Sequence, residues 1–272
     1  MTAEGSSPAA RASSPGIVAR VLGFLYGISA FLIFWLVGLY LVIFLGNFPP
    51  QETPWIEPTV DVGPSLGLVP AVIINTALLL LFGLQHSVMA RAHVKAWIER
   101  FIPTELERST YVHASNFALL ALMVFWQPIT IELWNLGDTV AEDVVFAGFG
   151  IGWGLLLFSW FTIGMGDLFG LRQSWAWLRN QPYEPVPFKT HWIYRHVRHP
   201  LYLGTLMVVW IAPFMTVGHV LFALGFTIYI AIGMRYEERD LVRTHGESYR
   251  EYQQSVPALF PRFGRRASDQ DA

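Results

Sequence analysis

The chain has 272 residues, of which 53% are hydrophobic and 14% are charged, and its mean hydropathy is +0.41. Soluble domains carry about 25% charged residues, so this composition excludes an ordinary soluble domain and predicts an integral membrane protein of the lipid bilayer. The absence of cysteine excludes disulfides, thiolate metal sites and cysteine nucleophiles. A formal net charge of −2 and a pI near 6.4 argue against nucleic acid as a partner, and nothing in the sequence fixes an oligomeric state.

The two ends of the chain lack the apolar residues that a packed core requires. Residues 1–16 are rich in Ser, Ala, Pro and Gly, and residues 262–272 are mostly charged or small. We predict that both segments are disordered tails. The remaining residues, 17–261, are predicted to form a single transmembrane domain.

Five stretches without Asp, Glu, Lys or Arg are long enough to cross a bilayer, whose hydrocarbon core of about 30 Å requires about 20 helical residues. The last stretch contains 36 residues, with Pro213, Thr216 and Gly218 near its centre, and one helix of that length would reach about 54 Å. We therefore expect this stretch to fold as a hairpin of two short spans. The five stretches are 21–51, 62–90, 109–131, 144–166 and 199–234.

Lys and Arg test the number of spans, because loops on the cytoplasmic side collect these residues. With six spans and a cytoplasmic N-terminus, all 18 Lys and Arg lie on the cytoplasmic side. The expected outer loops, 47–65 and 128–143, carry only acidic charges. The sequence therefore predicts an all-α, multi-pass membrane protein with six transmembrane helices, the last two forming the short hairpin, and with N and C termini in the cytoplasm.

The fourth predicted span contains glycines at every second position, which form two overlapping GxxxG patterns. Small residues at this spacing let a neighbouring helix approach closely. The pattern differs from the GxGxxG fingerprint of a dinucleotide-binding fold and follows no predicted strand, so we expect a packing role. These glycines are Gly148, Gly150, Gly152 and Gly154.

Unusual polar residues gather in three clusters at the predicted cytoplasmic ends of the spans. The first cluster is 85–91, the second is 107–111, and the third comprises 167–173, 191–204 and 235–238. Because the hairpin returns the chain to the side that it left, we expect 194–204 and 235–238 to be neighbours. We predict that the active site lies on this cytoplasmic side.

Two alternatives apply to the basic residues and histidines of the third cluster. His191, His196 and His199 are possible metal ligands, but the other histidines are scattered and no supporting carboxylate pattern accompanies them, so we predict no metal. A basic face that binds anionic lipid headgroups is the second alternative. The isolated histidines to which we assign an ordinary structural role are His93, His113, His219 and His245.

Two sets of motifs carry a resemblance to known families. Residues 198–204 are Arg-His-Pro-Leu-Tyr-Leu-Gly, and the hairpin is followed by Glu237-Glu238-Arg239, Gly246, Tyr249, Tyr252, Val256-Pro257 and Pro261. This pattern resembles the isoprenylcysteine carboxyl methyltransferase and phospholipid methyltransferase superfamily. Segments 85–91, 107–111 and 167–173 extend the resemblance to the methanethiol S-methyltransferases and their NnrU-like relatives. The resemblance implies S-adenosylmethionine as methyl donor and a small thiol, methanethiol, as the substrate that becomes dimethyl sulfide.

S-adenosylmethionine carries a sulfonium cation, an aminocarboxylate, a ribose and an adenine, so its site requires a cation, an acid and aromatic faces. The third cluster contains all of these. The candidates are Arg198 or Arg235 for the carboxylate, Glu237 or Glu238 for the amino or ribose groups, Tyr194 and Tyr202 for aromatic or hydroxyl contacts, and, by resemblance, His199 and Gly204. The alternative for the two glutamates is a solvated helix face.

A small thiol is mostly protonated at neutral pH, so the enzyme must orient it and remove its proton. His86 is our candidate base, because an imidazole ordinarily has a pKa near 6.5. We assign Arg172 to stabilise the developing thiolate, and Tyr111 or Asp167 to orient the reacting groups. The alternative for His86 is a buried histidine that only bonds to a neighbouring helix.

Two other functions remain open from the sequence. One is methyl transfer to a prenylated cysteine carboxylate or a phospholipid, which would require an opening between helices on the lipid side. The other is a transporter or structural membrane protein with a polar rim. Ion transport is disfavoured, because the predicted spans contain almost no charged groups.

Overall fold

The computed structural model describes residues 15–47, 58–184 and 192–261, and its secondary structure is mainly helical. The predicted tails lie outside the described residues except for 15–16, and His191 also lies outside them. The helices are α1 (Ile17–Gly46), α2 (Leu68–Met89), α3 (Ala92–Ile98), α4 (Thr104–Val124), α5 (Val140–Ile163), α6 (Met165–Leu168), α7 (Leu171–Arg179), the short 3-10 helix η1 (Trp192–Arg195), α8 (Pro200–Trp210), α9 (Val217–His245) and α10 (Glu247–Ser255).

Four helices are long and apolar enough to cross a membrane, namely α1, α2, α5 and α9. Their outward faces carry large apolar side chains such as Leu36, which is 67% exposed, and Ile151, which is 63% exposed. Water would not stabilise such faces, whereas lipid tails would. The protein is therefore an α-helical integral membrane protein.

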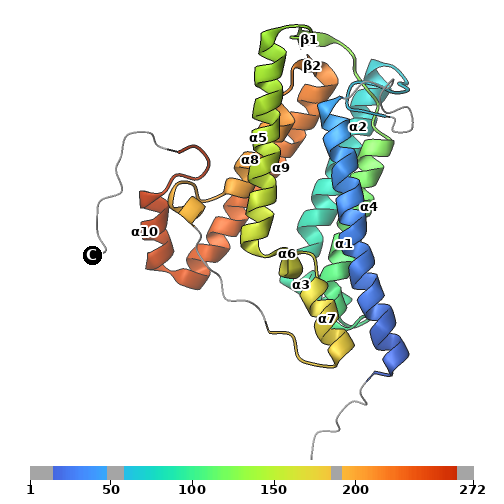
Figure 1. Cartoon of the computed structure of the whole chain (residues 1–272), viewed down its shortest axis with the longest axis vertical. Coiled ribbons are helices and arrows are strands. Elements are labelled where there is room, and N and C mark those ends of the chain that lie inside the picture. Colours follow the sequence, from blue (N-terminus) through green and yellow to red (C-terminus); the bar gives the residue numbers. More distant parts are fainter. Residues whose placement is uncertain (1–14, 48–57, 185–191, 262–272) are drawn as a thin grey trace, which may run out of the picture.

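Helix α4 is more polar than these four helices because its polar residues face other helices. Glu107, Ser109, His113 and Asn116 are all buried. The Asn116 amide donates a hydrogen bond of 3.1 Å to the carbonyl oxygen of Ala30 on α1. Since α4 packs against α1, α2 and α7, it forms the centre of one half of the bundle (Figure 1).

The predicted hairpin is present, but its two arms are unequal. Helix α8 has 11 residues and α9 has 29 residues, so the expectation of two short spans is wrong for α9. The helix continues beyond the apolar stretch because residues 234–245 contain good helix formers and no Gly or Pro. It ends at Gly246, whose φ of 62° turns the chain into α10.

A two-stranded sheet is the one departure from an all-α fold among the described residues. Strands β1 (Glu132–Asn135) and β2 (Phe214–Thr216) pair antiparallel, with Glu132 opposite Thr216 and Asn135 opposite Phe214. The sheet joins the α4–α5 connection to the turn of the α8–α9 hairpin at one end of the molecule (Figure 1).

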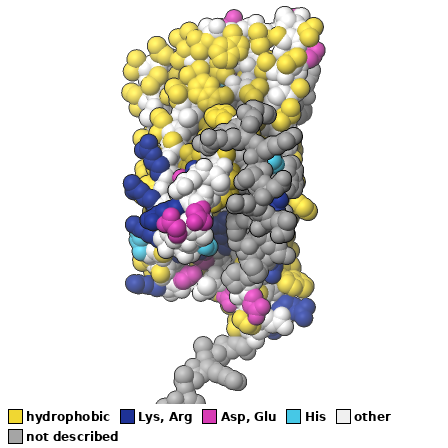
Figure 2. All heavy atoms as spheres, turned by 90° about the vertical axis from the view of Figure 1, so that its left-hand side faces the viewer, with side chains coloured by type: hydrophobic (Ala, Val, Ile, Leu, Met, Phe, Trp, Pro, Cys, Tyr) yellow, Lys and Arg dark blue, Asp and Glu magenta, His cyan; other side chains and the backbone are white. Residues whose placement is uncertain are grey.

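The two ends of the molecule differ in charge. Figure 1 places the sheet at one end and α3, α6 and α7 at the other, which we call the polar end. The described Lys and Arg belong to segments at the polar end: the starts of α1 and α4, the α2–α3 region, α7, η1 with the residues that follow it, the last part of α9, and α10. On the face in Figure 2, hydrophobic side chains fill the upper part, whereas the blue basic side chains gather below.

Helices α5 and α8 pack closely through glycines. A Cβ atom on Gly152 would lie 2.9 Å from Cβ of Met207, and one on Gly204 would lie 3.0 Å from the carbonyl oxygen of Gly152. Gly148 also faces α8, whereas Gly150 and Gly154 face open space. The packing role is therefore confirmed for one of the two GxxxG patterns, the pair Gly148 and Gly152.

The core near the sheet end encloses a buried polar cluster. Phe44, Trp126 and Phe222 are fully buried and pack edge to face or tilted against one another. Beside them, His219 Nδ1 lies 3.5 Å from Oδ2 of Asp61, and both side chains are fully buried. The Thr216 hydroxyl donates to Asp61 Oδ1 and accepts from the His219 backbone N–H at 3.1 Å, which caps α9. This contact agrees with the structural role expected for His219.

Candidate functional site

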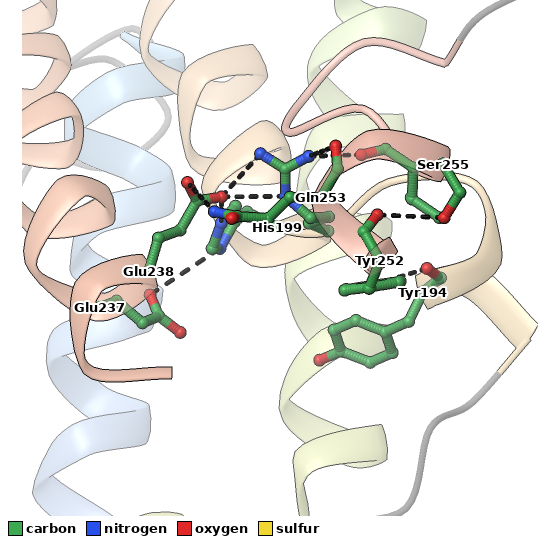
Figure 3. A network of polar contacts seen from close by, with 9 residues as sticks. Tyr194, His199, Glu237, Glu238, Tyr252, Gln253 and Ser255 are labelled. Carbon is green, nitrogen blue, oxygen red and sulfur yellow. Dashed lines mark hydrogen bonds and ion pairs between the residues drawn. The ribbon is translucent and has the colours of Figure 1, made fainter. Parts of the chain in front are cut away.

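The prediction that 194–204 and 235–238 are neighbours is confirmed (Figure 3). His199 Nε2 lies 2.9 Å from Glu238 Oε1, and the Tyr202 hydroxyl donates a hydrogen bond of 2.7 Å to Glu237 Oε2. His199 is the N-cap residue of α8, and Pro200 occupies the first turn, where its missing N–H has no helical partner to lose. The local sequence therefore fixes His199 at the start of the helix, facing α9.

All three guanidinium nitrogens of Arg198 contact other residues of the protein. Its Nε and Nη2 atoms lie 2.9 Å and 2.8 Å from Glu238 Oε1. Its Nη1 atom donates to the carbonyl oxygens of Gln253, at 3.0 Å, and Val256. Arg198 thus joins α9 to the end of α10, a role that the sequence did not predict.

The segment at and after α10 covers this cluster. Tyr252 donates a hydrogen bond of 2.6 Å to the carbonyl oxygen of Tyr194, and burial raises the pKa of the Tyr252 phenol to about 12. The backbone N–H groups of Arg198 and His199 donate to the carbonyl oxygens of Pro257 and Ala258 at 2.9 Å and 3.0 Å. We call these contacts the C-terminal latch. The motif residues Tyr252 and Pro257 were the sequence signal that could have indicated it.

Two charged groups of the cluster remain accessible. The Glu237 side chain is 46% exposed, and its second oxygen has no hydrogen-bond partner among the described residues. Arg235 is exposed two residues earlier on α9. Glu237 is an accessible acid next to Tyr202, whose ring stacks with the His199 ring at 5.3 Å, and this acid with its aromatic neighbours suits the amino, ribose and adenine groups of S-adenosylmethionine. Gly204 instead lies in the contact with α5, which accounts for its lack of a side chain.

His86 lies in a second polar group, where α2, α4 and α9 meet. Its Nδ1 atom lies 3.0 Å from the Ser115 hydroxyl, and its backbone carbonyl accepts a bond of 3.3 Å from the Tyr111 hydroxyl. The imidazole ring lies 5.0 Å from the Tyr111 ring and 6.1 Å from the Tyr229 ring. The structure therefore brings together His86 and Tyr111 and adds Tyr229, which was not among the residues predicted from the sequence.

Asp167 and Arg172 form a separate pair. Arg172 Nη1 lies 2.8 Å from Asp167 Oδ2, and the Tyr183 hydroxyl donates a bond of 2.6 Å to Asp167 Oδ1. Burial and this hydrogen bond raise the pKa of Tyr183 to about 12. Among the described residues, no hydrogen bond or ion pair links His86 to Arg172.

Arg108 connects the two groups, and no role for it was predicted from the sequence. Its guanidinium lies 4.9 Å above the Tyr111 ring, and its Nε donates a bond of 2.6 Å to the carbonyl oxygen of Leu168. The cation nearest to the His86 and Tyr111 pair is therefore placed by α4, not by α7. Its signal was its place between Glu107 and Ser109 in the second cluster.

Helix α9 links the His86 group to the His199 cluster. Tyr229, Gly233 and Glu237 follow one another at intervals of four residues, which places them on one face of the helix. A Cβ atom on Gly233 would lie 3.9 Å from the Tyr202 hydroxyl. Residues on this face therefore extend from the candidate base to the candidate cofactor cluster.

Among the described residues, no three His, Asp or Glu side chains are grouped as metal ligands would be.

The fold and the site define an α-helical membrane protein that carries acid, cation, imidazole and aromatic groups at one end. The chain is 41% identical over 254 residues to methanethiol S-methyltransferase of Crocosphaera subtropica, covering 93% of this chain and 97% of the relative. It is 41% identical to the enzyme of that name from Pseudomonas deceptionensis, covering 97% and 98%, and 39% identical to that from Mycobacterium tuberculosis, covering 89% and 97%. The chain belongs to the methanethiol S-methyltransferase family. No protein-family model and no solved structure matches it.

Proposed function

We propose that this protein transfers a methyl group from S-adenosylmethionine to methanethiol, giving dimethyl sulfide and S-adenosylhomocysteine. The observation that carries the proposal is the family membership over nearly the whole chain. Two observations support it: Glu237 of α9 is accessible and contacts Tyr202 beside the His199 ring, and Arg235 is exposed on the same helix. Bound S-adenosylmethionine would supply an activated methyl group on a sulfonium.

The cofactor cluster divides its residues into structural and binding groups. Glu238 already accepts bonds from Arg198, His199 and Gln253, so it holds the cluster together. Glu237 is the acid left to bind the amino or ribose groups, and Arg235 is the cation left to bind the carboxylate. The Tyr202 hydroxyl orients Glu237, and the rings of Tyr202 and His199 offer an aromatic surface.

The His86 group is the proposed acceptor site. His86 Nδ1 contacts Ser115, so the opposite nitrogen, Nε2, takes the proton from the thiol. Arg108 provides positive charge for the thiolate, and its position 4.9 Å above the Tyr111 ring favours it over Arg172 for that role. The Tyr111 hydroxyl donates to the His86 carbonyl oxygen and so orients His86. The sulfur lone pair then forms a bond to the methyl carbon as the bond from that carbon to the sulfonium breaks. Asp167 holds Arg172 and Tyr183 in a separate pair, which Arg108 connects to the His86 group.

We further propose a topology of six spans with the polar end in the cytoplasm. The two spans added to the four apolar helices are α4 and the segment 200–216, in which the 11 residues of α8 are continued by the non-helical residues 211–216. The distribution of basic residues supports it, because they gather at one end. Single cysteines are easily read in a chain that has none. Gln181→Cys and Glu247→Cys should be labelled from one side of the membrane and Asp143→Cys from the other. Labelling of Glu247→Cys and Asp143→Cys from the same side would contradict this topology.

Formation of S-adenosylhomocysteine tests the proposed reaction. Purified protein should produce it from S-adenosylmethionine only when methanethiol is added, and liquid chromatography measures it. Glu237→Gln and Arg235→Gln should both reduce its formation. Glu247→Gln is the matched control, because Glu247 is exposed on α10 and pairs only with Arg250 among the described residues. Production that does not depend on methanethiol would contradict the proposal.

A further inference from the structure

A groove of about 940 Å³ runs between α2 and α9, which are in contact. We call it the α2–α9 groove. Leu80 and Leu84 of α2 and Leu224 and Ile228 of α9 line it, and between 45% and 61% of each residue is exposed. Both helices have the length and composition of membrane spans, so the groove opens where lipid tails would lie.

The lining changes from apolar to polar at one end of the groove. Along most of its length the walls are Leu, Ile and Gly. At the polar end, His86, Ser87 and Tyr229 line it. Arg91 closes the same end, with its guanidinium 4.4 Å above the Tyr236 ring. The groove therefore leads from the apolar surface of the helices to the candidate base.

Methanethiol does not account for the size of this groove. The molecule has one carbon and one sulfur, whereas pockets of about 300–1,000 Å³ hold drug-sized ligands. On α2 the lining extends from Thr76 past Ser87, which corresponds to about 17 Å of helix. A ligand that uses this space has a hydrocarbon chain along the walls and its reactive atom at His86.

We propose that the α2–α9 groove admits the hydrocarbon chain of lipophilic thiols, so that the protein also methylates alkanethiols much longer than methanethiol. This inference rests on the proposed function, because the methyl donor and the base are the same. The thiol gives its proton to His86, and its sulfur forms a bond to the methyl carbon. The bond from that carbon to the sulfonium sulfur breaks, which leaves S-adenosylhomocysteine and an alkyl methyl sulfide. The chain enters from the lipid side with its sulfur leading.

The test compares alkanethiols from methanethiol to octanethiol, with the alkyl methyl sulfides measured by gas chromatography and mass spectrometry. Burial of each added methylene should raise kcat/KM by about fourfold until the groove is filled. Leu80→Trp and Leu224→Trp place a large ring in the groove, away from His86. Each should lower kcat/KM for octanethiol at least tenfold and leave that for methanethiol within twofold.

Leu36→Trp and Ile151→Trp are the matched controls, because both residues are exposed and apolar and lie outside the groove. Long thiols partition into detergent or lipid to the same extent with these variants as with the wild type. The kcat/KM values of both controls should therefore match those of the wild type for every thiol. Methanethiol turnover without octanethiol turnover would overturn this inference and leave the proposed function intact. Octanethiol turnover that neither groove variant reduces would also overturn it. Absence of methanethiol turnover in the wild type would overturn the proposed function itself.

Discussion

The carboxylate oxygen Oε1 of Glu238 lies 2.9 Å from Nε2 of His199, and Arg198 binds the same oxygen. One acid on α9 thus holds the start of α8. The neighbouring Glu237 is more exposed and contacts Tyr202. Adjacent glutamates on one helix therefore have different environments, and we expect them to have different functions.

Glu237→Gln should weaken S-adenosylmethionine binding about tenfold or more, because a hydrogen bond to a charged group contributes about 1.5–3 kcal/mol. Its thermal unfolding temperature should stay near that of the wild type. Glu238→Gln should instead lower the free energy of unfolding by about 1–3 kcal/mol, because Arg198 loses its ion pair. Isothermal titration and thermal unfolding of both variants separate the two effects. A stable Glu238→Gln protein and unchanged affinity in Glu237→Gln would contradict this division.

Alanine substitutions should distinguish the glycines at the contact of α5 with α8 from a glycine of α5 outside that contact. Gly152→Ala and Gly204→Ala should destabilise the protein, because each added Cβ meets backbone atoms or Cβ of Met207 at about 3 Å. Gly154→Ala should be neutral or stabilising by up to about 1 kcal/mol, since its Cβ meets open space. Thermal unfolding in detergent measures all three. Equal stability of the three variants would show that the close approach of α5 and α8 contributes nothing.

The buried cluster of Asp61, Thr216 and His219 should be sensitive to loss of one hydroxyl. Thr216→Val removes the donor to Asp61 and the cap of α9, and should lower the free energy of unfolding by about 1–3 kcal/mol. Thr139→Val is the matched control, because Thr139 is the exposed N-cap residue of α5 and its side chain makes no capping bond. Among the described residues its hydroxyl donates only to the Leu136 carbonyl oxygen, in an exposed hydrogen bond that water can replace. Denaturation should show a loss for Thr216→Val alone. A loss of the same size in both variants would argue against a special role for the cluster.

His86→Ala should reduce turnover about 100-fold at pH 7, as expected for loss of a general base, with little change in S-adenosylmethionine affinity. The loss should shrink as the pH approaches 10, because thiols ionise in this range without help.

The C-terminal latch remains intact up to pH 10. The pKa of Tyr252 is raised to about 12 from an ordinary 10, so its bond to Tyr194 is fully present below pH 10 and is lost only as the pH rises through 12.

His93→Ala is the control for this pH profile, because His93 is an exposed histidine on α3. Its profile should match that of the wild type. A constant ratio of wild-type to His86→Ala rates across the whole pH range would contradict the role of His86 as base.

The arrangement of the candidate site was predictable at the level of segments. Charge-free stretches show where lipid contacts a helix, and the turn residues near Pro213 imply that the chain reverses its direction. The contact of 194–204 with 235–238 could therefore be predicted from the sequence. The length of α9 could not be predicted in this way, because a change from apolar to charged residues does not end a helix. Its end at Gly246 depends on backbone conformation.

The structural role of Arg198 was not predictable from the sequence. It depends on α10, which folds back so that the Gln253 and Val256 carbonyls meet Arg198. Similarly, Asp61 had the position of an outer-loop acid, yet it is fully buried beside His219. Contacts between residues so distant in sequence leave no local periodicity by which they can be recognised.

The most direct test of the central claim is headspace gas chromatography of purified protein incubated with methanethiol and S-adenosylmethionine that carries a deuterated methyl group. We predict dimethyl sulfide with one deuterated methyl group, formed in equal amount to S-adenosylhomocysteine, and strongly reduced formation by Tyr202→Ala and Glu237→Gln. Absence of deuterated dimethyl sulfide from a folded wild-type protein that binds S-adenosylmethionine would contradict the claim that this chain is a thiol methyltransferase.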